Sequence, residues 1–130
     1  MDTDETQIMT RKTTIDLVTY DSKRDAHILV VVEQGDGSTD CLRRLQERLH
    51  DYVEIAVDGF LAEKYPESKG KSVVIRLDCY DVPREAYEQF FFRFAEHIHA
   101  STEIQAAIAK HRHIKDIDFE FNWRRITDVV

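Results

Sequence analysis

Within the segment from residue 115 to residue 123, apolar and polar side chains alternate without a break from Ile117 to Trp123. Its apolar members are Ile117, Phe119, Phe121 and Trp123, and its polar members are Asp118, Glu120 and Asn122. Because successive side chains of a strand point to opposite faces, this period predicts a strand with one buried and one polar face. The chain therefore needs a hydrophobic layer on one side of a sheet, which excludes an all-helical fold.

Three further segments have the composition of strands. Residues 13–20 are rich in β-branched and aromatic side chains. Residues 26–34 contain the run Ile28–Val32, which is apolar on both faces and predicts a central strand. The polar residues 21–25 between these two segments predict a hairpin turn. Residues 72–80 alternate, with Val73, Ile75, Leu77 and Cys79 on one face and Arg76, Asp78 and Tyr80 on the other.

The segment after the second predicted strand has the spacing of a long amphipathic helix. Thr39 and Asp40 are candidates for its N-cap, and apolar residues recur at helical spacing from Leu42 onward. Gly59 weakens its last turn, and the Tyr65–Pro66 pair ends it.

A second helical pattern begins at Pro83, a residue suited to the first helical position. Its apolar stripe is made of Tyr87, Phe90, Phe91, Phe94 and Ile98. Ser101–Glu103 can interrupt this helix, since Thr102 and Gln105 have the spacing of a capping box. A short third helix would then run to about Lys110, and otherwise the second helix is one long element.

The predicted order is β-β-α-β-α-(α)-β, which is typical of an α+β two-layer sandwich. We expect a sheet of about four strands, mostly antiparallel, with two or three helices on one face. The connection through the first helix could place the third strand parallel to the second. Residues 1–12 are expected to be a disordered acidic tail. Residues 13–130 are expected to form a single domain.

The charge of the chain restricts its partners. It holds 18 Lys and Arg against 25 Asp and Glu, which gives a formal net charge of −7. Without a basic stripe, binding to nucleic acid or to an anionic membrane surface is not expected. The N-terminus has no apolar segment of a secretory signal, so a cytoplasmic location is expected. A basic protein partner is compatible with this charge.

Neither the cysteines nor the histidines predict a metal site, and no cofactor motif is present. Cys41 and Cys79 have no paired spacing, and Cys79 falls on the apolar face of its strand. The H-x-H pairs are His97 with His99 and His111 with His113. A helix separates the first pair by about 200°, and the second pair flanks a helix end, where histidine complements the dipole.

The polar face of the sheet is the candidate binding face. Its predicted members are Tyr20, Arg76, Asp78, Tyr80, Glu120 and Asn122. Tyr20 is included on the assumption that Ile15 and Leu17 point to the core. Such a face is either a plain solvated surface or a binding surface, because antiparallel sheets commonly leave one face in water.

Residues 15–123 resemble a family of small uncharacterised bacterial proteins that is known only as a domain of unknown function. The features that carry the resemblance are Ile15–Leu17, the helical segment Leu42–Leu49, the Tyr65–Pro66 pair and Gly70–Lys71. The resemblance implies an α+β fold and a bacterial cytoplasmic origin. It carries over no catalytic residue.

Two classes of function remain open. The first is a non-catalytic protein-interaction or regulatory module, for example an immunity-type protein that neutralises a basic partner. The alternative is a small-molecule-binding domain or minor enzyme that uses the polar sheet face, and no catalytic residue is assigned. A homodimer is also expected, because Ile126, Val129 and Val130 follow Trp123 and could cover a second copy or fold back on their own sheet.

Overall fold

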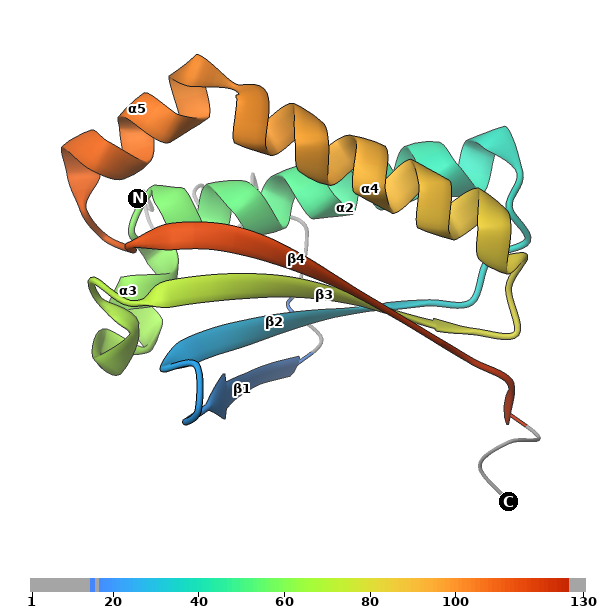
Figure 1. Ribbon diagram of the computed structural model, residues 1–130, viewed down its shortest axis with the longest axis horizontal. Coiled ribbons are helices and arrows are strands. Elements are labelled where there is room, and N and C mark those ends of the chain that lie inside the picture. Colours follow the sequence, from blue (N-terminus) through green and yellow to red (C-terminus); the bar gives the residue numbers. More distant parts are fainter. Residues whose placement is uncertain (1–14, 16, 127–130) are drawn as a thin grey trace, which may run out of the picture.

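The computed structural model of the protein describes residue 15 and residues 17–126 (Figure 1). In chain order the elements are β1 (Leu17–Asp21), β2 (Ala26–Glu33), α2 (Thr39–Val57), α3 (Phe60–Lys64), the 3-10 turn η1 (Pro66–Ser68), β3 (Ser72–Tyr80), α4 (Arg84–Ala100), α5 (Thr102–His111) and β4 (Asp116–Arg124). The α+β class is confirmed. The predicted tail, residues 1–12, and the apolar pair Val129 and Val130 lie outside the described residues.

The sheet has the order β1-β2-β3-β4 and is mixed. Of the strand pairs in the described residues, β1 with β2 is antiparallel, whereas β2 with β3 and β3 with β4 are parallel. The prediction of a mostly antiparallel sheet is therefore wrong, and the parallel placement of the third strand is right. The physical reason is that helical segments connect β2 to β3 and β3 to β4, and such crossovers return the chain in the same direction.

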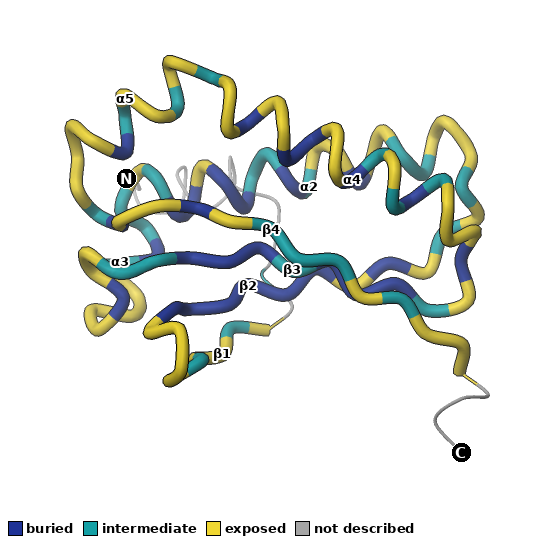
Figure 2. Tube along the Cα trace, viewed as in Figure 1, coloured by how far each residue is buried: buried dark blue, intermediate teal, exposed yellow. Residues whose placement is uncertain are grey.

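One face of the sheet packs against the helices and forms the main core (Figure 2). The strands contribute Leu29, Val31, Val73, Ile75, Leu77, Cys79 and Ile117 to this core, and the helices contribute residues such as Leu45, Leu49, Tyr52, Tyr87, Phe91 and Ile98. Phe119, Phe121 and Trp123 pack against it, so the predicted orientation of the last strand is confirmed. In the part of the chain that the structure describes, no helix is long and apolar enough to cross a bilayer.

The helix boundaries differ from the predicted ones at several places. Ser38, not Thr39 or Asp40, is the N-cap of α2, and Pro83 is the N-cap of α4 and not its first residue. The first predicted helix is divided between α2 and α3 at Gly59, whose φ is +99° and which lies against the ring of His113. The predicted break before the third helix is present, but Ser101, not Thr102, is its N-cap. The Ser101 hydroxyl accepts a hydrogen bond from Ile104 N, and the Gln105 side chain donates to the carbonyl of Ile98.

The two cysteines are predicted to differ in reactivity. Cys79 is 1% exposed, and burial, together with Glu33 and Asp78, raises the pKa of its thiol to about 12. Cys41 is half-buried in the first turn of α2. Because the thiolate is the reactive species, a thiol reagent at pH 8 should label Cys41 of the folded protein quickly. It should label Cys79 only after unfolding. Peptide mapping that finds rapid labelling of Cys79 would contradict this.

Candidate functional site: the open face of the sheet

The face of the sheet opposite the helices, called the open face here, brings together five of the six predicted site residues. Arg76 lies beside Glu120, and Asp78 lies beside Asn122, in the register of β3 and β4. Tyr80 follows on the same face two positions after Asp78. These residues alternate with the core residues of the same strands, so the period of each strand places them together.

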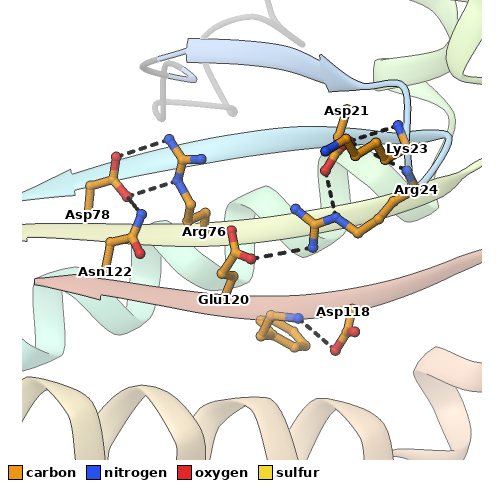
Figure 3. Close-up of polar contacts among 9 residues, drawn as sticks. Asp21, Lys23, Arg24, Arg76, Asp78, Asp118, Glu120 and Asn122 are labelled. Carbon is orange, nitrogen blue, oxygen red and sulfur yellow. Dashed lines mark hydrogen bonds and ion pairs between the residues drawn. The ribbon is translucent and has the colours of Figure 1, made fainter.

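Three of these residues form a fixed polar network, the Arg76 network (Figure 3). Arg76 donates to both carboxylate oxygens of Asp78, with 2.9 Å from Nε to Oδ1 and 3.3 Å from a terminal nitrogen to Oδ2. Asn122 also donates to Asp78 Oδ1, over 3.3 Å. Asp78 is only 9% exposed, and this bidentate pairing provides hydrogen-bond partners for its charge in a poorly solvated position.

A second set of ion pairs, the Arg24 bridge, crosses the open face. Arg24 comes from the turn between β1 and β2, and its guanidinium lies 2.7 Å from Asp21 and 3.4 Å from Glu120 on β4 (Figure 3). The hydrogen bond from Arg24 lowers the pKa of Asp21 and raises that of Arg24. Sequence reasoning assigned Asp21 and Arg24 to a plain turn and did not connect them to Glu120, because Arg24 and Glu120 are 96 positions apart.

Beneath these charges lies a small apolar cluster, separate from the main core. It consists of Ala26, Ile28, Val30 and Val74, each between 1% and 4% exposed. The long side chains of Arg24 and Arg76 run over this face, and their methylene groups can shield apolar surface while the guanidinium groups stay solvated. The open face is therefore a charged layer over a thin apolar one.

Tyr20 does not belong to this face, and its prediction requires correction. Leu17 pairs with Val30 and is 54% exposed, so the phase of β1 is the reverse of the expected one. Tyr20 pairs with His27 on the opposite face, and its hydroxyl donates to Asp25 over 2.5 Å. That hydrogen bond raises the pKa of Tyr20.

Asp25 also forms an ion pair with Lys71, with 2.8 Å between Lys71 Nζ and Asp25 Oδ2. The hydrogen bonds from Lys71 and Tyr20 lower the pKa of Asp25, and Asp25 in turn raises the pKa of Lys71. This group ties the hairpin turn to the start of β3. It lies on the surface away from the five clustered residues.

A depression of about 220 Å³ lies at the end of the open face where β3 and β4 terminate. Its lining residues are Arg76, Asp78, Cys79, Tyr80, Asn122 and Arg124. Four of them are predicted site residues, and Arg124 adds a cation. Ligand pockets are usually about 300–1,000 Å³, so the depression is small and suits at most a compact polar molecule.

Sequence reasoning missed a buried polar group at the end of β2, called the Glu33 cluster. The Tyr87 hydroxyl on α4 donates to Glu33 over 2.9 Å, and the backbone N–H of Gly35 donates to the same oxygen over 3.1 Å. Arg48 on α2 lies 3.4 Å from the other oxygen. Burial and the hydrogen bond to Glu33 raise the pKa of Tyr87.

The Glu33 cluster joins β2, α2 and α4, which are far apart in the sequence. No periodic signal could have found it, because Tyr87 is also a regular member of the apolar stripe of its helix. Each carboxylate oxygen is already occupied by a donor of the chain itself. We therefore assign the cluster a structural role.

The two histidines of the first H-x-H pair have different neighbours, as their helical spacing predicts. His99 contacts the carbonyl of Ile117 over 3.0 Å, whereas the ring of His97 lies near that of His50. The rings of His111 and His113 are stacked, with centroids 5.9 Å apart. Within residues 15 and 17–126, no group of three or more His, Cys, Asp or Glu side chains is placed to hold a metal ion.

A scan against protein families matches residues 7–112 to a family of unknown function (DUF6572). The match covers most of the chain, and the protein therefore belongs to this family. Searches of curated proteins and of solved structures found no match. The family assignment agrees with the resemblance noted from the sequence, and it brings no activity with it.

Proposed function

We propose that the protein is a non-catalytic protein-interaction module that binds a basic partner through the acidic side of the open face. The supporting observation is a row of carboxylates on β4, the acidic row, made of Asp116, Asp118 and Glu120. They alternate with core residues, so all three point to the same side of the sheet.

The charge of the acidic row is only partly balanced. Glu120 belongs to the Arg24 bridge, but Asp116 and Asp118 are exposed and form no ion pair with another described residue. A surface of one sign attracts partners of the opposite sign and speeds their encounter. An immunity-type role, in which an acidic domain neutralises a basic protein, is one form of this function.

The experiment is a pull-down from the lysate of the source organism with three versions of the chain. The test variant is Asp116→Asn with Asp118→Asn, which keeps side-chain oxygens that can accept hydrogen bonds. The control is Glu96→Gln with Glu103→Gln, which removes the same charge from exposed positions of α4 and α5. We expect a basic protein to be retained at low salt by the wild type and the control, and lost by the test variant.

Two results would contradict the proposal. One is that no protein is retained even at low salt, where screening is weakest. The other is equal retention by the test variant and the control, which would move the contact away from the acidic row.

A second candidate, binding of a small polar molecule, is favoured by the depression at the end of β3 and β4. It contains Arg76, Asp78, Tyr80 and Asn122, with Arg124 beside them. Arg76 is engaged by Asp78, so Arg124 is the cation available to an anionic ligand. Melting curves with small carboxylates and phosphates would test this, and a stabilising compound should lose its effect in Arg124→Gln. A library without effect on the wild type would exclude those classes.

A further inference from the structure

The outer edge of β4 has no strand beside it in the part of the chain that the structure describes. Among the described strands β4 pairs only with β3, although it is nine residues long. Figure 1 shows its second half running away from α4 toward the C-terminus. A long unpaired edge presents backbone N–H and C=O groups and readily accepts another strand.

The first half of this edge is occupied by the chain's own side chains. His99 contacts the carbonyl oxygen of Ile117 over 3.0 Å, and the Asp118 carboxylate accepts the N–H of Phe119 over 2.9 Å. In a strand, alternate residues direct their backbone groups to the same edge. The outward groups of the second half therefore belong to Phe121 and Trp123. Arg124, which follows Trp123, confirms this alternation. Its carbonyl points inward, toward β3, and accepts a hydrogen bond from Asp81 N.

The second half of β4 has a self-complementary sequence. From residue 120 to residue 124 it reads acid, aromatic, amide, aromatic, base: Glu120, Phe121, Asn122, Trp123, Arg124. In an antiparallel pair of two copies centred on Asn122, Glu120 faces Arg124 of the other copy on the open face. On the helix face, Phe121 faces Trp123 of the other copy. At the centre, the Asn122 residues of the two copies face each other. Opposite charges and aromatic pairs at facing positions stabilise such pairing.

The surroundings of the segment also suit a second copy. Arg124 forms no ion pair with another described residue, so its guanidinium is available for Glu120 of the other copy. On the helix face, Phe92 of α4 is 44% exposed, and its ring lies against Phe121 with centroids 6.2 Å apart. An exposed aromatic beside an unpaired edge would be covered when two copies meet.

We propose that two copies of the chain form a homodimer by antiparallel pairing of β4 about Asn122, which joins their sheets into one. The contact uses the backbone of Phe121 and Trp123 and leaves the partners of Ile117 and Phe119 in place. It differs from a dimer held by the residues that follow β4. It also goes beyond the proposed function, since Asp116 and Asp118 stay outside the paired segment.

The first test measures mass by light scattering after gel filtration, across the micromolar range. The wild type should have twice the mass of one chain. Arg124→Glu places two acids opposite each other at both ends of the contact and should raise the dissociation constant about tenfold or more. The double variant Glu120→Arg with Arg124→Glu restores opposite charges and should recover the dimer. A wild type of single-chain mass would overturn the proposal, including the case in which the edge takes a strand of another protein.

The second test locates the two-fold axis. Facing residues of a non-hydrogen-bonded antiparallel pair lie about 4.5 Å apart between Cα atoms, a distance that a disulfide can span. Asn122→Cys should therefore form a disulfide-linked dimer under mild oxidation. Asp118→Cys, on the same face but four positions from the axis, should not. Linkage of neither variant, or equal linkage of both, would overturn the β4 contact even if the protein is a dimer.

Discussion

Replacing Phe91 by alanine should lower the free energy of unfolding by about 3–5 kcal/mol, the range for large-to-small aromatic changes in cores. Phe91 is 0% exposed, and its ring contacts those of Phe119 and Phe121 on β4. It therefore links α4 to the edge strand of the sheet. The loss includes both the transfer of the ring from water and the cavity left between the two layers. Denaturant unfolding monitored by circular dichroism measures it.

The matched control is the next residue of the same helix. Phe92 is 44% exposed, so Phe92→Ala removes a ring of the same size with much less loss of burial. Its effect on unfolding of the single chain should stay below about 1 kcal/mol, as for most surface substitutions. Similar losses of unfolding free energy for Phe91→Ala and Phe92→Ala would mean that α4 packs a different side on the sheet from the one described.

The positions of the strands and helices could be predicted from the sequence because each has a clear period. The alternation from Ile117 to Trp123 defines a strand with one apolar face, whatever lies beside it. The direction of the neighbouring strands has no such signal. The alternation of buried and solvated side chains in the last strand suggested an antiparallel sheet. However, β4 is the edge strand of a parallel pair, and its face opposite the helices is polar all the same.

Part of the candidate site was predictable for the same reason. Arg76, Asp78 and Tyr80 share a strand, as do Glu120 and Asn122, so the period alone placed them on one face. The prediction for Tyr20 was wrong because β1 is only five residues long, and a shift of one residue moves every side chain to the other face. The antiparallel register with β2, which pairs Leu17 with Val30, fixes that phase. No local pattern reports this register.

The Glu33 cluster could not be predicted from the sequence. A substitution beside it should have the second large effect on the free energy of unfolding. Gly35 has no side chain, and an added Cβ would lie 2.5 Å from Glu33 Oε2 and closer still to the Tyr87 hydroxyl. Both groups are buried and hydrogen-bonded to each other. Gly35→Ala should therefore cost about 1–3 kcal/mol of unfolding free energy, as overpacking does. Nothing in the sequence around Gly35 indicates this requirement, because Tyr87 is 52 positions away along the chain.

A double-mutant cycle can separate the steric cause from a general effect on the loop. Tyr87→Phe removes the hydroxyl and leaves Glu33 without one donor, at a cost of about 1–3 kcal/mol. It also removes the atom that an alanine at position 35 would meet first. Gly35→Ala should therefore cost less in the Tyr87→Phe background than in the wild type, with a coupling of about 1 kcal/mol. Denaturant melts of the four proteins measure the coupling, and strictly additive losses would show that the close approach of the loop to Tyr87 is not what demands glycine at this position.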